Sequence, residues 1–329
     1  MKCNLKNKKV MITGGLGFIG SNLACECLEL GAKVTIYDCL EPNSGGNMYN
    51  IHNIREDITL KLHDILNFDQ ISQCIADNDI IINCAASTSH PFSMSEPWAN
   101  NDVNVKGVIN ILEAIRRFNP EARFVHIGTT TQLGKLKYTP ADEFHPEFPM
   151  DIYSANKCSS EKYVLIYASA HNLKASVIRL SNVFGPKAAI HSPEFTFNNY
   201  FVGLALQNKS ITVFGRGEQK RNVIYVDDAI RAIISIISST KTYGETLLGV
   251  SDEHFSIAQI AKETVTHIGS GKVEFHNWPK TRKAIEVGDA IISNNKIKEL
   301  TDWVPENNLV DGLLKTKAYY NNCKEQYLR

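Results

Sequence analysis

A tyrosine and a lysine four residues apart carry the clearest chemistry in this sequence. Tyr153 and Lys157 lie in the stretch DIYSANKCSSEKYVLIY, whose pattern predicts a helix over Tyr153–His171. On a helix, side chains four residues apart share a face, so the ammonium can stand beside the phenol. A tyrosine with its ordinary pKa is a poor base at neutral pH, whereas an adjacent cation favours the phenolate. The pair therefore predicts a general base that acts on a hydroxyl group.

Thr129 distinguishes this pair from a chance match. Tyr320 and Lys324 have the same spacing, which we interpret as chance on a surface helix. Thr129 lies 24 residues before Tyr153, directly after the predicted strand Arg123–Gly128. Its hydroxyl would project over the carboxyl edge of a sheet, where ligands of open α/β sheets bind. We therefore expect Thr129, Tyr153 and Lys157 to act together.

A glycine-rich turn predicts a dinucleotide site. The stretch TGGLGFIG joins a predicted strand, Lys9–Thr13, to a predicted helix, Ile19–Leu30. Glycine lets the backbone turn sharply and approach a pyrophosphate, whose charge then meets the amides of the helix N-terminus. We expect the cofactor to contact Gly14, Gly17, Phe18, Ile19 and Gly20.

Asp38 indicates which dinucleotide binds. It ends the predicted strand Lys33–Asp38, 18 residues after Gly20. A carboxylate there can accept hydrogen bonds from the ribose hydroxyls and would repel a 2′-phosphate, which favours NAD over NADP. Asp64 and Ile65, after the third strand, could contact the adenine, although aspartate after a strand is also a common turn residue.

The elements that must position these residues alternate along the first half of the chain. Near-continuous apolar strands with helices between them predict a Rossmann-type doubly wound parallel sheet, followed by a smaller C-terminal α/β substrate lobe. We predict that residues 1–180, rejoined by 222–248, bind NAD and that 181–221 and 249–329 bind the substrate. The remaining expected strands are Thr59–His63, Asp79–Ala85 and Ala175–Leu180, and the remaining expected helices are Phe68–Ile75 and Asn101–Phe118.

Composition excludes several other classes of protein. The 329 residues are 43% hydrophobic and 21% charged, and Lys+Arg and Asp+Glu both number 35. The absence of a basic excess argues against a nucleic-acid partner. The N-terminus lacks the apolar core of a signal peptide and no apolar stretch could span a bilayer, so we expect a cytoplasmic protein with no membrane partner.

The eight cysteines include no CxxC pair and the histidines lack ligand spacing, so we expect reduced thiols and no metal.

As a set, these motifs resemble a known family. TGGLGFIG, Asp38, GTTTQLG, YSANK, SNVFGP and RNVIYVDD occur in the order and spacing of the extended short-chain dehydrogenases/reductases. The likeness is to their nucleotide-sugar epimerase/dehydratase branch, which includes UDP-glucose 4-epimerases, and it runs from Lys9 to about Tyr320. It implies that Tyr153 is the catalytic base, that Lys157 contacts Tyr153 and the nicotinamide ribose, and that Thr129 hydrogen-bonds the reacting sugar hydroxyl.

The resemblance also implies contacts to a nucleotide-sugar substrate. Asn182 and Arg221 correspond to residues that contact the substrate diphosphate, for which a guanidinium is well suited. Asn182 could instead be a turn former, and Arg221 could form a surface ion pair with Asp227 or Asp228. We expect the residues after the Asn83–Ala86 strand end to line the sugar site, namely Ser87, Thr88, Ser89 and His90.

Departures from the family pattern bear on the reaction. In 4,6-dehydratases of the family an Asp and a Glu follow the threonine, whereas Thr130 and Thr131 here carry no carboxyl groups. Elimination of water needs an acid and a base, which argues against dehydration. Decarboxylases of the family usually carry a Glu at the place of Thr131, so the resemblance argues against decarboxylation as well. Glu286 stands where the family often has a nucleotide-contacting Arg. Arg282 or Lys283 could substitute, which leaves the nucleotide base open.

The interpretation we favour is an epimerase that retains NAD and inverts C4 through a transient keto sugar. Retention suits a reaction without net redox change. C2 epimerisation, a nucleotide-sugar dehydrogenase or ketoreductase, and a noncatalytic NAD-sensing module stay open as alternatives. The resemblance further implies a homodimer paired through Asn101–Phe118 and Tyr153–His171, and a role in polysaccharide precursor synthesis.

Overall fold

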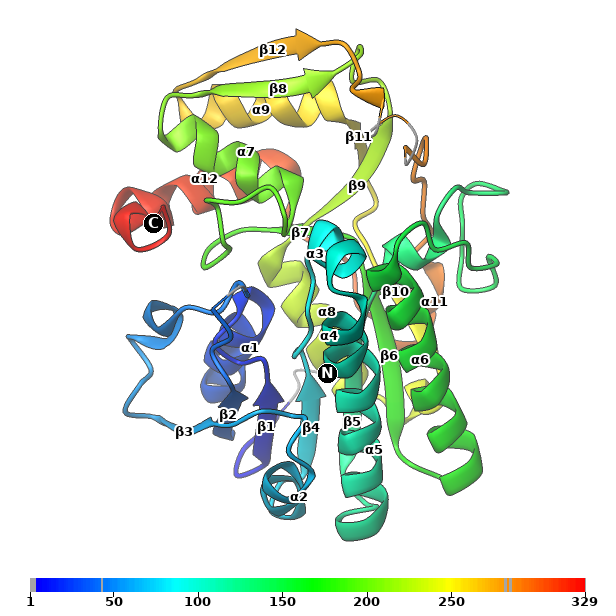
Figure 1. The fold of residues 1–329 in the computed structure, drawn as a ribbon. Helices are drawn as coiled ribbons and strands as arrows, with labels where there is room; N and C mark the ends of the chain where they lie inside the picture. Colours follow the sequence, from blue (N-terminus) through cyan, green and yellow to red (C-terminus); the bar gives the residue numbers. More distant parts are fainter. Residues whose placement is uncertain (1–3, 43, 281–282, 284–285, 329) are drawn as a thin grey trace.

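A seven-stranded parallel sheet forms the centre of the computed structural model, which describes residues 4–42, 44–280, 283 and 286–328 (Figure 1). The strand order is β10-β6-β5-β4-β1-β2-β3, and every neighbouring pair is parallel. Chain progression reverses direction between β1 and β4, which makes their carboxyl ends the expected ligand site. The Rossmann-type fold is thus confirmed. The strands are β1 (Lys9–Thr13), β2 (Lys33–Asp38), β3 (Ile58–Leu62), β4 (Ile80–Asn83), β5 (Arg123–Thr129), β6 (Ala175–Leu180) and β10 (Thr246–Gly249).

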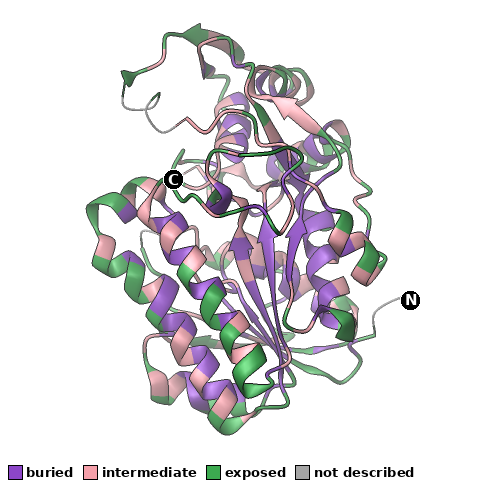
Figure 2. Cartoon of the chain, turned by 90° about the vertical axis from the view of Figure 1, so that its right-hand side faces the viewer, coloured by how far each residue is buried: buried purple, intermediate pink, exposed green. Residues whose placement is uncertain are grey.

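Helices cover both faces of this sheet because successive side chains of each strand point to opposite faces. In β1, Val10 and Ile12 pack in one apolar cluster with α1 (Phe18–Glu29) and α8 (Val226–Ser238), whereas Met11 packs in another. Figure 2 shows the strands buried between these layers. The second cluster contains residues from α2 (Phe68–Ala76), α5 (Gly107–Phe118) and α6 (Ile152–His171).

Two elements differ from the sequence-based prediction. The helix expected from Asn101 becomes α5 only at Gly107, because α4 (Pro97–Asn101) is followed by one π-helical turn at Asp102–Lys106. The strand β10 was not predicted, because its four-residue apolar run is too short to distinguish from other buried segments.

The C-terminal part adds two small sheets above the carboxyl edge of the main sheet (Figure 1). Within the expected rejoining segment 222–248, α8 and β10 belong to the main sheet layer, whereas residues 222–225 lie in β9 of the upper lobe. Conversely α11 (Asn295–Thr301), from the expected lobe, contacts α8 and β10. One small sheet has the strand order β11 (His254–Ser256), β9 (Lys220–Tyr225) and β7 (Asn182–Phe184). The other pairs β12 (Lys272–His276) with β8 (Ser210–Phe214). The helices of this part are α7 (Phe197–Leu206), α9 (Ile257–Ile268) and α12 (Leu309–Asn321).

The second Tyr/Lys pair does not share a helix. Helix α12 ends at Asn321, before Lys324, and Tyr320 is fully buried, so its expected place on a helix surface is wrong. Its hydroxyl donates to the carbonyl oxygen of Ala188 at 2.8 Å. Tyr320 is therefore a core residue.

No helix among the described residues is both long enough and apolar enough to cross a membrane.

Candidate active site

A cavity of about 580 Å³ lies at the carboxyl edge of the main sheet, under the upper lobe. Its wall contains most residues predicted to bind the cofactor or to act in catalysis. From the N-terminal half these are Gly14, Gly17, Phe18, Ile19, Gly20, Asp38, Asp64, Ile65, Thr129, Tyr153 and Lys157. The fold thus brings together groups that lie far apart in the sequence.

The glycine turn is shaped for close contact with a phosphate. Gly14 has a φ of +67°, and a Cβ there would lie 2.6 Å from the backbone nitrogen of Ala85. A Cβ on Gly20 would lie 2.3 Å from the carbonyl oxygen of Gly14. Within the described part of the chain, the first-turn amides of Phe18, Ile19 and Gly20 donate no hydrogen bond. Free amides at a helix N-terminus suit a pyrophosphate, so these residues fit NAD.

Asp38 lies where its carboxylate can contact a ribose. One oxygen accepts from the amide of Leu16 at 2.9 Å and the other from Leu40 at 2.8 Å, which leaves acceptor capacity on both oxygens. Burial raises the pKa of Asp38, although these two amides act in the opposite direction. The carboxylate of Asp64 accepts a hydrogen bond from the amide of Leu66 at 2.9 Å, as a turn residue would.

Asp38→Asn is expected to weaken NAD binding about 10- to 100-fold, because hydrogen bonds to a charged acceptor contribute about 1.5–3 kcal/mol. The preference for NAD over NADP should also narrow, since the charge that repels a 2′-phosphate is lost. Isothermal titration of both dinucleotides measures the two effects. Asp64→Asn is the control, and it should change the NAD affinity less than Asp38→Asn.

The catalytic candidates meet at the start of α6. Asp151 caps this helix by accepting from the amide of Ser154 at 2.7 Å, which fixes the first turn that carries Tyr153. Lys157, one turn later, donates to the carbonyl oxygen of Ile127 at 2.6 Å. The hydroxyl of Thr129 lies 3.1 Å from that of Thr131 and faces the same cavity.

Tyr153 has a raised pKa in this structure, mainly because it is buried. Burial, and then the negative charge of Asp151, raise its pKa, and a hydrogen bond with Thr129 only partly opposes them. These effects outweigh the lowering that we expected from Lys157. Burial lowers the pKa of Lys157 itself to about 8. The positive nicotinamide ring of bound NAD would supply a charge that favours the phenolate.

Lys157→Met should make stability respond differently to pH. The folded pKa of Lys157, about 8, lies below its ordinary value of 10.5, so between these values the unfolded chain binds more protons than the folded chain. The wild-type free energy of unfolding therefore gains about 3 kcal/mol from this group as pH rises through that window. The free energy of unfolding of the variant minus that of the wild type should therefore fall by that amount as pH rises. Urea unfolding of cofactor-stripped protein from neutral pH to pH 10.5 tests this, and a constant difference would contradict it.

A buried polar chain lies beneath Lys157 and was not found from the sequence. The Nζ of Lys157 is 3.2 Å from Nε2 of His126, and Nδ1 of His126 is 3.0 Å from the amide nitrogen of Asn83. Thr13 donates to Asn83 at 2.5 Å. Burial and the charge of Lys157 lower the pKa of His126 well below its ordinary value. A neutral imidazole therefore contacts the ammonium group of Lys157.

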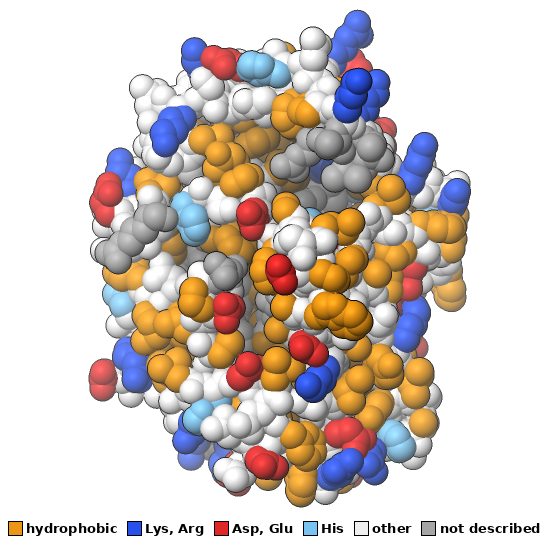
Figure 3. Space-filling model, viewed as in Figure 1, with side chains coloured by type: hydrophobic (Ala, Val, Ile, Leu, Met, Phe, Trp, Pro, Cys, Tyr) orange, Lys and Arg blue, Asp and Glu red, His pale blue; other side chains and the backbone are white. Residues whose placement is uncertain are grey.

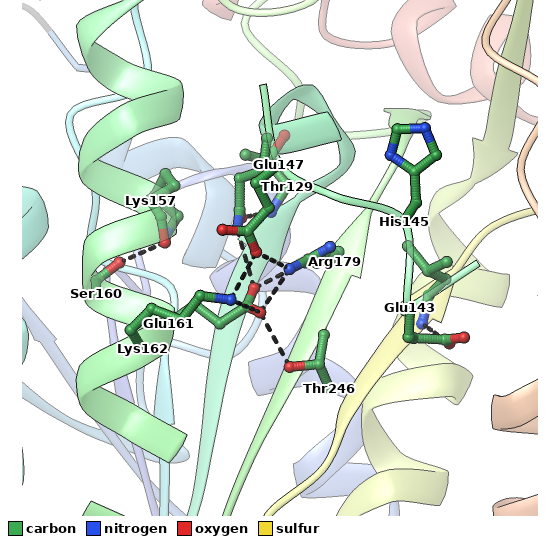
Figure 4. Close-up of polar contacts among 12 residues, drawn as sticks. Thr129, Glu143, His145, Glu147, Lys157, Ser160, Glu161, Lys162, Arg179 and Thr246 are labelled. Atoms are coloured by element: carbon green, nitrogen blue, oxygen red, sulfur yellow. Dashed lines mark hydrogen bonds and ion pairs between the residues drawn. The ribbon is translucent and has the colours of Figure 1, made fainter. Parts of the chain in front are cut away.

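A second network fixes the loop that carries Thr129 (Figure 4). The side-chain carbonyl of Gln132 accepts from the amide of Thr129 at 3.2 Å, and its amide group donates to Glu161 at 3.0 Å. Glu161 in turn binds Arg179 through two hydrogen bonds, of 2.8 and 2.6 Å. Burial is the largest single effect and would raise the pKa of Glu161, but Arg179, Gln132 and Lys162 together outweigh it and the pKa is lowered. The network therefore joins β6, α6 and the catalytic loop.

The predicted substrate residues separate into two groups. Ser87, Thr88 and Asn182 line the cavity. Ser89 does not: its hydroxyl caps α3 (His90–Ser95) and donates to Glu194 at 2.8 Å. A substrate contact by Ser89 is therefore not supported.

Arg221 also lies outside the cavity wall. One of its nitrogens contacts Glu286 at 2.6 Å, and the other donates to the carbonyl oxygens of Lys220 and Gly288. Its ion-pair partner is thus Glu286, and not Asp227 or Asp228. Arg282 lies outside the described residues.

No metal centre is found among the described residues, because no three His, Cys, Asp or Glu side chains gather as ligands. Seven cysteines are described, and none of them forms a disulfide.

Comparisons with known proteins identify the family to which the chain belongs. The model of the NAD dependent epimerase/dehydratase family matches residues 10–258. A putative UDP-glucose 4-epimerase of Methanocaldococcus jannaschii is 26% identical, over 95% of this chain and 98% of its own length. UDP-glucuronic acid decarboxylase 1 of Xenopus tropicalis is 28% identical, over 95% of this chain and 72% of its own. The structure of dTDP-glucose 4,6-dehydratase from Bacillus anthracis in complex with NAD has a TM-score of 0.84 and 25% identity, over 97% and 98% of the two chains. These three are named for different reactions of nucleotide sugars.

Proposed function

Because the chain belongs to the NAD-dependent epimerase/dehydratase family and its cofactor is NAD, we propose that it is a nucleotide-sugar epimerase that inverts C4 of a hexose. The carrying observation is that Thr129, Tyr153 and Lys157 share one cavity with the glycine turn. Thr130 and Thr131 bring only hydroxyls to the same wall, where 4,6-dehydratases of the family carry the acid and base for elimination.

Each residue has a defined task in this reaction. Tyr153 accepts the proton of the C4 hydroxyl, and Thr129 hydrogen-bonds the same oxygen. Lys157, held by His126 and the carbonyl of Ile127, stabilises the phenolate by its charge. NAD, which the glycine turn and Asp38 would hold, would supply the reversible hydride transfer at C4. Asn182 lies at the lobe side of the cavity, where it can contact the diphosphate while the hexose moves.

Arg221 can reach a diphosphate only if Glu286 releases it. The two side chains are largely buried, 15% and 23% exposed, so their attraction is weakly screened. Glu286→Gln keeps the shape of the pair and removes the charge. We expect the KM for the nucleotide sugar to fall about 5- to 10-fold with kcat unchanged, since ion pairing that competes with phosphate is weakened. Arg221→Ala should raise KM, and an unchanged KM in both variants would remove Arg221 from the diphosphate site.

The decisive experiment follows the sugar and the cofactor together. Purified protein is assayed for released NAD, then incubated with UDP-, dTDP-, CDP- and GDP-sugars in deuterated water, and the products are identified by NMR. The proposal predicts bound NAD and a C4 stereoisomer without solvent deuterium at C4. Accumulation of reduced cofactor with a keto product would instead identify a dehydrogenase. Need for an added reductant would identify a ketoreductase, and inversion at C2 a C2-epimerase.

A homodimer is expected in addition. Hydrophobic side chains are visible over the helices α4–α6 in Figure 3. The exposed hydrophobic residues of these helices include Trp98, Phe118 and Ile166, which are 84%, 54% and 54% exposed. Exposed apolar groups of this size favour association. Sedimentation equilibrium measures the state, and a monomer at micromolar concentration would contradict it.

A further inference from the structure

A histidine and an aspartate form a pair in the cavity, next to Tyr153. His90 is the first residue of α3, and its Nδ1 lies 2.6 Å from Oδ2 of Asp151. The other oxygen of Asp151 caps α6, so the carboxylate is fixed from two sides. The imidazole ring stands edge-on to the ring of Tyr153, with their centroids 5.0 Å apart.

The second ring nitrogen of His90 is available to a ligand. The side chain is 39% exposed and lines the cavity, and no described residue hydrogen-bonds its Nε2. Burial is the largest single effect and would raise the pKa of Asp151, but the hydrogen bonds with His90 and Ser154 and the charge of a protonated His90 together outweigh it, so the pKa is lowered. A carboxylate can only accept, so Nδ1 carries a hydrogen, and Nε2 presents a lone pair whenever the ring is uncharged. This is the arrangement of a general acid/base oriented by a carboxylate.

Inversion at C4 does not require this second acid/base. Tyr153 already handles the proton of the hydroxyl, and the hydrogen on C4 travels as hydride. Once C4 is a ketone, however, the hydrogens on the two flanking ring carbons become acidic, because the electron pair can delocalise onto the keto oxygen. A second base beside Tyr153 is placed for that proton.

We propose that His90, oriented by Asp151, is a second general acid/base that moves a proton at the ring carbon next to the keto carbon. The inference rests on the proposed function, which supplies the keto sugar. In the step a C–H bond breaks, its proton goes to Nε2, and its electron pair becomes the C=C bond of an enol. The keto oxygen takes the proton held by Tyr153, and the reverse step returns a proton from Nε2 to carbon. No oxidant or reductant is consumed.

The substrate must carry a hydrogen on C3 or C5, and the site can exchange that hydrogen with solvent as well as invert C4. The lack of carboxyl groups on Thr130 and Thr131 does not exclude this chemistry, because His90 and Asp151 come from two other elements.

The test measures solvent deuterium at C3 and C5 separately from cofactor reduction. Holoenzyme is incubated with UDP-glucose, dTDP-glucose and UDP-glucuronate in deuterated water. Ring-carbon labelling is followed by NMR and reduced cofactor by its ultraviolet absorbance. We expect wild type to label C3 or C5. His90→Gln should slow labelling about 100-fold or more, a typical contribution of a general acid/base, while formation of reduced cofactor falls much less.

Two further variants separate catalysis from folding. Asp151→Ser keeps a capping oxygen for α6 and removes the partner of His90, so labelling should fall about 10-fold without loss of the folded state. His267→Gln is the matched control, because His267 also pairs with a carboxylate, Glu263 at 3.0 Å, but lies on α9 outside the cavity. It should leave labelling unchanged.

The outcomes are distinguishable. If a C4 epimer forms without label at C3 or C5, the proposed function stands and the role of His90 is overturned. Equal labelling by wild type and His90→Gln also overturns it. If no probe is oxidised or epimerised, the proposed function fails, and the inference about His90 fails with it.

Discussion

Tyr153→Phe is expected to lower kcat about 1,000-fold, the middle of the range for loss of a general acid/base. Tyr153 is 8% exposed and phenylalanine fills the same volume, so the packing of α6 against the catalytic loop should survive. Lys157 and Thr129 keep their places, and NAD should still bind, because the glycine turn and Asp38 are untouched. The fall should therefore appear in kcat with little change in cofactor content, measured by steady-state kinetics and by NAD released per chain.

Tyr320→Phe is the natural control for this variant. Tyr320 has the same sequence relation to a lysine but is buried in α12, where its hydroxyl donates to Ala188. Loss of that hydrogen bond should cost about 1 kcal/mol of stability and leave kcat near wild type. Wild-type kcat in Tyr153→Phe would exclude Tyr153 as the catalytic base.

Arg179→Met is expected to lower the free energy of unfolding by about 3–5 kcal/mol, the cost of breaking a buried ion pair from one side. Arg179 is 2% exposed and Glu161 1% exposed, and Arg179 also contacts Glu147. Methionine fills part of the space but leaves the buried carboxylate of Glu161 without its close cation, whereas Glu147 keeps Lys162 (Figure 4). Chemical denaturation followed by circular dichroism measures the loss at neutral pH.

The same variant should lose less stability in acid. With Arg179 present the pKa of Glu161 is lowered, so the stabilisation from this carboxylate is full above its unfolded pKa and is lost as pH falls through its folded pKa. Without Arg179 there is little of it to lose. Lys162→Met is the control: Lys162 also pairs with Glu147, at 2.8 Å, but is 53% exposed, so its removal should cost under about 1 kcal/mol. Equal losses in the two variants would contradict a special role for the buried arginine.

The sheet and the cofactor turn could be predicted from sequence because their signals are local. Apolar runs such as Lys9–Thr13 and Ala175–Leu180 match the observed strands, and the glycine turn lies directly between a strand and a helix. The π-helical turn before α5 could not be predicted, because it keeps the apolar spacing of a helix while changing its hydrogen bonds.

The rest of the site depends on contacts between distant segments. His90 and Asp151 are 61 residues apart, and neither belongs to a motif that suggests a pair. The sequence also did not indicate the network of Gln132, Glu161 and Arg179, because a polar or charged residue in a sequence gives no sign of being buried. Arg221 was assigned from the family pattern, but its contact with Glu286 depends on a loop more than 60 residues away.

The path of the chain between the two lobes decides how the protein can be divided. The chain leaves the main sheet after β6, returns to it for α8 and β10, and leaves again. A fragment ending at Leu180 would lack β10 and expose the backbone of β6 as an unprotected edge, and it would uncover the apolar face that α8 covers. Such a truncated product should aggregate when expressed. A shortened form for crystallisation or fusion must therefore keep the chain at least through Gly249.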